Sequence, residues 1–164
     1  MLFRSQFNQG PLKQMLRDAG IAYVFLGREL GARPRDPSCY QGGRVQYARL
    51  AQTQLFREGL RRVMDGAQKY RLALLCAEKE PLACHRALLV ARELEACGVD
   101  VIHIHGDGTL EPHRQSMVRL LRLLGLADQE NFFKDQEQLI LDACAMQEEK
   151  IAYVDESAEG PVTL

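Results

Sequence analysis

Three short apolar segments constrain the fold of this chain more than any other feature. They cover residues 21–26, 72–77 and 99–104. Each is shorter than a typical helix and is bounded by polar or glycine-containing sequence, which is typical of strands buried on both faces. Helical patterns separate the segments, and strand, helix and strand in alternation predict βαβ units with right-handed crossovers. We therefore expect an α/β fold with three layers and a mainly parallel sheet.

The expected helices surround these strands. A short helix near Pro11 is expected to end at Gly20, and a later one runs from Leu82 or Cys84 to Cys97. Further helices are expected near residues 44–51, 53–69, 112–124 and 134–149, with a short extended piece at 151–154. Three strands make a narrow sheet. Residues 1–154 are predicted to form a single α/β domain, followed by a loose tail at 155–164.

The composition predicts a reduced, cytoplasmic protein without a membrane span. No apolar run approaches the roughly 20 residues that cross a bilayer, and the N-terminus lacks the pattern of a secretory signal. The five cysteines are odd in number and irregularly spaced, which argues against a disulfide framework. Residues 1–71 hold 13 Lys/Arg against 5 Asp/Glu, whereas residues 72–164 hold 8 against 17. The basic first half indicates an anionic partner, or else the two halves neutralise one another.

The loop between Cys76 and Arg86 is the best candidate for chemistry. Cys84 lies near an expected helix start, where free N–H groups and a partial positive charge lower a thiol pKa. The neighbouring His85 and Arg86 would add to this effect, and Glu78 could transfer protons. Ligands bind at the carboxyl ends of parallel strands. We therefore expect this loop to share one edge of the sheet with the long loop 27–43 and with His105.

Four interpretations of this loop stay open. The cysteines could be structural, they could serve a thiol-dependent enzyme, the loop could bind an anion through Arg86 and the helix start, or it could bind a metal. The metal interpretation is the weakest, because Cys-x₇-Cys-His differs from the common zinc spacing of Cys-x₂₋₄-Cys. No metal site is therefore predicted, and the sequence contains no positive indication of a cofactor.

The loop also carries a family resemblance. The string Cys76-Ala-Glu78-Lys-Glu-Pro81-Leu-Ala-Cys84-His85-Arg86 closely resembles the signature of the bacterial domain of unknown function 488 family, and the blocks at 20–24 and 26–34 resemble its upstream part. The resemblance implies that the family's N-terminal strand, helix and strand are missing here. It names no reaction. The site residues that it implies are Cys76, Glu78, Pro81, Cys84, His85 and Arg86, with Glu29, Gly31 and Arg33 from the facing loop and Asn8 from upstream.

The leading hypothesis is a thiol-dependent enzyme for a small anionic or nucleotide-like substrate. Cys84 would be the nucleophile or redox thiol, Cys76 its partner and His85 or Glu78 the proton carrier. Arg86 and Arg33 would anchor the anion. The alternative is a non-catalytic module that binds the phosphate of a nucleotide or nucleic acid, with structural cysteines. The oligomeric state does not follow from the sequence.

Overall fold

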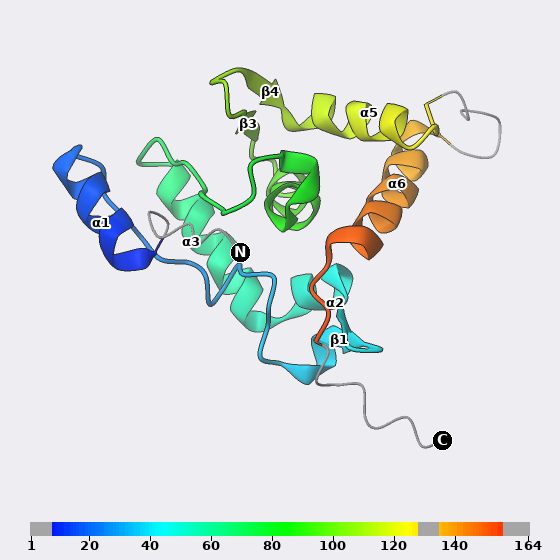
Figure 1. Ribbon diagram of the computed structural model, residues 1–164, viewed down its shortest axis with the longest axis horizontal. Helices are drawn as coiled ribbons and strands as arrows, with labels where there is room; N and C mark the ends of the chain where they lie inside the picture. Colours follow the sequence, from blue (N-terminus) through cyan, green and yellow to red (C-terminus); the bar gives the residue numbers. More distant parts are fainter. Residues whose placement is uncertain (1–7, 128–134, 156–164) are drawn as a thin grey trace.

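The described part of the chain is mainly helical. The computed structural model describes residues 8–127 and 135–155 (Figure 1). Its α-helices are α1 (Gln9–Asp18), α2 (Tyr47–Gln52), α3 (Gln54–Ala67), α4 (Arg92–Ala96), α5 (His113–Leu123) and α6 (Gln136–Ile151). Its strands are β1 (Tyr40–Gln41), β2 (Arg44–Val45), β3 (Ile102–Ile104) and β4 (Leu110–Pro112), and the shorter helical pieces are η2 (Pro37–Cys39), η3 (Pro81–Ala83) and η4 (Arg86–Ala91). Helices and strands are thus mixed, as the sequence predicted at this coarse level.

The parallel sheet predicted from the sequence is not formed by the described residues. Their sheets are two antiparallel pairs, β1 with β2 and β3 with β4. The segments 21–26 and 72–77 form no strand, and only the third predicted strand is present, as the shorter β3. A strand is stabilised by a hydrogen-bonded neighbour, and apolar propensity alone does not supply one. Accordingly Val24 and Leu75 are 63% and 59% exposed.

Most of the predicted helices are confirmed. The patterns near residues 8–19, 53–69, 112–124 and 134–149 correspond to α1, α3, α5 and α6. Helix α3 begins where it does because the Thr53 side chain accepts a hydrogen bond from the Phe56 backbone N–H at 3.2 Å. The helix predicted at 44–51 starts only at Tyr47, since Arg44 and Val45 belong to the β1–β2 hairpin.

The helix predicted after the cysteine loop is divided. The turn η3 comes first and Cys84 follows in an extended conformation, with φ −134° and ψ 135°. A π-helical segment, η4, and then α4 complete the stretch to Ala96. The division places Cys84 and His85 at the start of the continuous helical run rather than inside it.

The helices pack around one apolar cluster. Its fully buried members include Phe56 of α3, Leu88 of η4, Leu120 of α5 and Leu139 of α6. Near the end of α6 the chain returns to the first hairpin, where Val154 bridges to Arg44 (Figure 1). The predicted extended piece at 151–154 is thus limited to this bridge. Apart from residue 155, the predicted tail at 155–164 lies outside the described residues.

The helices of the described part are all too short or too polar to cross a membrane.

Candidate functional site

The backbone of the cysteine loop is set by η3 and the residues around it. The Glu80 side chain accepts a hydrogen bond from the backbone N–H of Leu82 at 3.1 Å and so caps the turn. After the turn, the backbone N–H of Arg86 donates to the Cys84 sulfur at 3.3 Å. This N–H belongs to the first turn of the helical run, where backbone donors lack helical partners. The Cys84 sulfur is therefore held at the helix start, as the sequence indicated.

Two thiols and an imidazole come together at this point. One ligand atom each from Cys76, Cys84 and His85 lies within 4.8 Å of the others. The Cys84 sulfur and His85 Nδ1 are 3.9 Å apart. Cys84 is only 1% exposed, whereas Cys76 and His85 are half-buried. We call these three residues the Cys–Cys–His cluster.

The two thiols of the cluster have opposite pKa shifts. Hydrogen bonds from the Cys84 thiol, from His85 and from the backbone N–H of Glu78 lower the pKa of Cys76 far below its ordinary value and outweigh the effect of burial. The pKa of Cys84 is raised, because its thiol is the donor to Cys76 and because it is buried beside that negative charge. The cluster thus favours one thiolate, at Cys76, held by a protonated Cys84.

The cluster forms part of the wall of a cavity of about 480 Å³. The long loop contributes Gly31 and Arg33 to the same wall, and Glu78 lines it from the cysteine loop. Two aromatic side chains, Tyr47 and Tyr153, complete the polar part of the lining. The long loop and the cysteine loop thus meet at one cavity even though the parallel sheet that was expected to align them is absent from the described residues.

The long loop approaches the cavity in a conformation that its residues enforce. A Cβ at Gly31 would lie 2.3 Å from the carbonyl oxygen of Gly27, so a larger residue does not fit the turn. Arg33 follows, and its guanidinium carbon lies 4.6 Å from the centroid of the Tyr153 ring. This cation–π contact places a positive charge at the cavity wall.

Other predicted site residues lie away from this cavity. Glu29 forms an ion pair with Arg62 of α3, and Asn8 is an exposed residue at the start of α1 that makes no capping bond. Arg86 does not line the cavity, although its charge acts on Cys84. His105 lines a separate hollow of about 510 Å³ together with Lys79.

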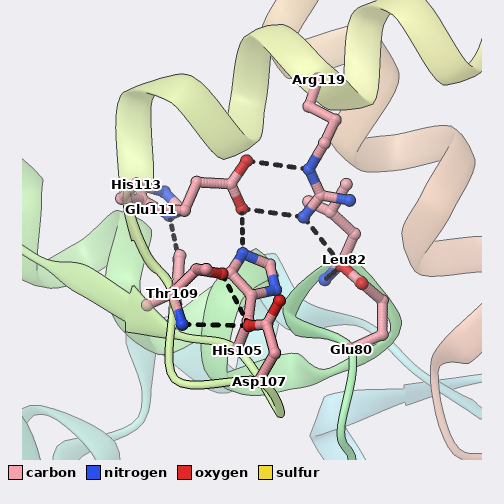
Figure 2. Close-up of polar contacts among 9 residues, drawn as sticks. Glu80, Leu82, His105, Asp107, Thr109, Glu111, His113 and Arg119 are labelled. Carbon is pink, nitrogen blue, oxygen red and sulfur yellow. Dashed lines mark hydrogen bonds and ion pairs between the residues drawn. The ribbon is translucent and has the colours of Figure 1, made fainter.

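His105 belongs to a polar network that supports the cysteine loop (Figure 2). Its Nε2 lies 2.9 Å from a carboxylate oxygen of Glu111, and Arg119 binds both oxygens of that carboxylate at 2.8 and 2.9 Å. Arg119 also donates to Glu80 at 2.9 Å. Because Glu80 caps η3, the network connects α5 and β4 to the loop that bears the two thiols. His105 thus supports the cysteine loop and does not line the cavity at the Cys–Cys–His cluster.

Sequence reasoning missed the aromatic wall and the role of Arg119. Tyr47 and Tyr153 are 106 residues apart in the chain, and no local pattern connects them. Burial, and to a lesser degree the nearby charge of Glu148, raises the pKa of the Tyr47 hydroxyl. Arg119 resembles any surface residue of an amphipathic helix, so only its contacts reveal its function.

Comparison with known proteins gives one match. A family model described as Domain of unknown function DUF488 covers residues 2–92, which is more than half of the 164 residues. The match includes both loops of the cavity and the whole Cys–Cys–His cluster. None of the curated proteins and none of the solved structures compared with the chain matches it.

Proposed function

The chain belongs to the Domain of unknown function DUF488 family, and we propose that it is a thiol-dependent enzyme for a small anionic substrate, with Cys76 as its nucleophile. The observation that carries the proposal is the convergence of two thiols and an imidazole within 4.8 Å on a cavity wall. A nucleophile beside a proton-carrying group, oriented by a third, is the arrangement that covalent catalysis uses.

The assignment of the nucleophile differs from the one expected from the sequence. Cys84 was expected to attack, because it lies at a helix start. Its burial, at 1% exposure, leaves it little room to meet a substrate, and it serves as the hydrogen-bond donor to Cys76. Cys76 is half-buried and lines the cavity. These contacts favour Cys76 as the attacking thiolate and Cys84 as the residue that stabilises it.

The proposed reaction is a displacement followed by hydrolysis. The Cys76 thiolate attacks an electrophilic atom of the substrate, so that a bond to sulfur forms as the bond to the leaving group breaks. His85 or Glu78 gives a proton to the leaving group. The same residue then takes a proton from water, which cleaves the bond to sulfur and regenerates the thiolate. The net reaction is the hydrolysis of the substrate, and it needs no oxidant or reductant.

The cavity supports a substrate with a negative charge. Arg33 lies at the wall and is kept there by its contact with Tyr153. A fixed positive charge beside a partly enclosed cavity raises the local concentration of anions. Glu78 lies at the same cavity and restricts where the negative group can sit. We propose that the anionic group is held near Arg33 while the electrophilic atom is directed toward Cys76.

Alkylation of the native chain tests the nucleophile. Iodoacetamide is applied near pH 6 with a metal chelator and a reductant, and the modified cysteines are identified by mass spectrometry. Cys76 should react first, and Cys76→Ser should abolish this reaction. Cys97→Ser removes an exposed thiol and is the matched control, which should leave the rate at Cys76 unchanged. If Cys76 reacts only after the chain is unfolded, the proposed thiolate chemistry is wrong.

The anionic reagent iodoacetate tests the role of Arg33. The rate at Cys76 with iodoacetate, divided by the rate with iodoacetamide, should fall severalfold in Arg33→Met. Arg35→Met changes a neighbouring loop arginine that does not line the cavity and should keep the ratio of the parent chain. An equal fall in both variants would show that the general charge of the loop, and no anion position at Arg33, determines the preference.

A further inference from the structure

The Cys–Cys–His cluster also has the composition of a metal site. Thiolate sulfur and imidazole nitrogen are the donors that bind Zn²⁺ most often in proteins. The three ligand atoms come from positions 76, 84 and 85, and all lie within 4.8 Å of one another. Two of the three donors are adjacent in the chain, and η3 folds the third back to meet them.

The separations are close to those of a bound zinc ion. With Zn–S near 2.3 Å and Zn–N near 2.0 Å, tetrahedral ligation places two sulfurs about 3.8 Å apart and a sulfur and nitrogen about 3.5 Å apart. The distance between the Cys84 sulfur and His85 Nδ1 is 3.9 Å. The remaining separations do not exceed 4.8 Å. The ligand atoms would therefore have to approach one another by about 1 Å or less from their observed separations.

We propose that Cys76, Cys84 and His85 bind a single Zn²⁺ ion, with the fourth coordination position facing the cavity. Three protein ligands and one open position are the pattern of zinc sites that accept water or a substrate atom, whereas structural sites have four protein ligands. Glu78 lines the same cavity, but its carboxylate is not among the ligand atoms that lie within 4.8 Å of one another. Water is therefore the expected occupant of the fourth position.

The surroundings hold the ligands in place. The N–H of Arg86 donates to the Cys84 sulfur at 3.3 Å, as backbone donors do to metal-bound thiolates. Glu80 caps the turn between the two cysteines and is itself held by Arg119 at 2.9 Å. Groups that hydrogen-bond to the metal-binding residues and orient them contribute strongly to metal affinity. The network of Figure 2 therefore serves the metal site as it serves the thiols.

Zinc binding would regulate the reaction proposed above. A zinc ion on Cys76 occupies the electron pair with which the thiolate attacks, so the metal-bound chain should be inactive in nucleophilic chemistry. This consequence rests on the proposed function. The binding itself does not, because it depends only on the positions and types of the three ligands.

Titration of the reduced, metal-free chain with zinc sulfate tests the site. Isothermal calorimetry should show one ion per chain, and X-ray absorption at the zinc edge should show two sulfur neighbours. Binding should weaken by at least about 100-fold in Cys76→Ser and in His85→Gln. Cys97→Ser, which removes an exposed thiol outside the cluster, should bind as the parent chain does. Because Cys76 is half-buried, its serine variant is the one expected to fold normally, which circular dichroism checks.

The outcomes separate this inference from the proposed function. Failure of the parent chain to bind zinc, or equal binding by Cys76→Ser, overturns the metal site. Fast alkylation of Cys76 in the metal-free chain would leave the proposed function standing in that case. If zinc binds with two sulfur neighbours while Cys76 of the metal-free chain stays inert, the metal site is supported and the nucleophile is wrong. If both hold, zinc should protect Cys76 from iodoacetamide at one equivalent per chain.

Discussion

The buried pair His103 and His113 predicts a loss of stability in mild acid. The two imidazoles are 4% and 2% exposed, and His103 Nε2 lies 2.9 Å from His113 Nδ1. Burial first, and then the charges of His103 and Arg92, lower the pKa of His113 from 6.5 to about 4, against the opposing effect of Glu111. His113 Nε2 finds no hydrogen-bond partner among the described residues, so no hydrogen bond from that atom stabilises a second proton on this ring.

The direction and size of the effect follow from proton binding. Below pH 6.5 the unfolded chain protonates this histidine while the folded chain does not, so protonation favours unfolding. The stability is fully present above pH 6.5 and is lost as the pH falls toward 4, the folded pKa. Between pH 7.5 and pH 5 this lowers the free energy of unfolding by about 2 kcal/mol from His113 alone. The pKa of His103 is lowered as well, so its contribution has the same sign.

Urea denaturation at pH 7.5, 6 and 5 measures this dependence, and His113→Asn removes the titrating group. The asparagine amide can take the place of Nδ1 opposite His103, while it does not ionise. Other groups titrate in the same range, so the informative quantity is the difference between the parent chain and the variant at each pH. The variant should be less stable at pH 7.5, and this deficit should shrink by about 2 kcal/mol at pH 5. A deficit that is independent of pH would refute the argument that His113 is buried and neutral.

Two further changes probe the parts that support the cavity. Glu111→Gln should lower the free energy of unfolding at pH 7 by about 1.5–3 kcal/mol, the usual contribution of a hydrogen bond to a charged group. Because Arg119 first, and then other donors, lower the pKa of Glu111 to about 2, this deficit should shrink as the pH falls from 4.5 toward 2. A deficit that stays constant with pH in urea titrations would contradict the ion pair. Gly59→Ala should destabilise the chain by about 1–3 kcal/mol, because the added Cβ would lie 2.6 Å from the Glu29 Cβ. The variant should also slow alkylation of Cys76, since the loop that packs against α3 forms part of the cavity. A variant as stable as the parent chain in thermal melts would show that the loop moves aside without loss of stability.

Local sequence signals predicted the helices well. The spacing of apolar residues indicated α3, α5 and α6, and Thr53 and Asp135 provide the capping side chains with which α3 and α6 begin. Such signals act over a few residues and need no distant partner. The candidate site could also be located from local sequence, because Cys76, Cys84 and His85 lie within ten residues of one another.

The sheet could not be predicted in this way. The segments 21–26 and 72–77 have strand propensity, but strand formation also requires a hydrogen-bonded neighbour at the right distance. The described residues provide such neighbours only for the short hairpins β1–β2 and β3–β4. Apolar side chains of the two unpaired segments, such as Val24 and Leu75, are consequently exposed.

The sequence alone determined which short loop is the candidate for chemistry, while the tertiary structure decided how the loop is arranged. A spacing of seven residues between the cysteines suggested no metal site, because common zinc motifs rely on closer spacing within one turn. The capped turn η3 brings Cys76 back to Cys84 and His85. The hydrogen bond between the two thiols, together with the burial of Cys84, then favours Cys84 as the donor and the half-buried Cys76 as the thiolate. The contact of Arg33 with Tyr153 joins residues 120 positions apart. Burial and long-range contacts depend on the whole fold, so no local pattern could have revealed them.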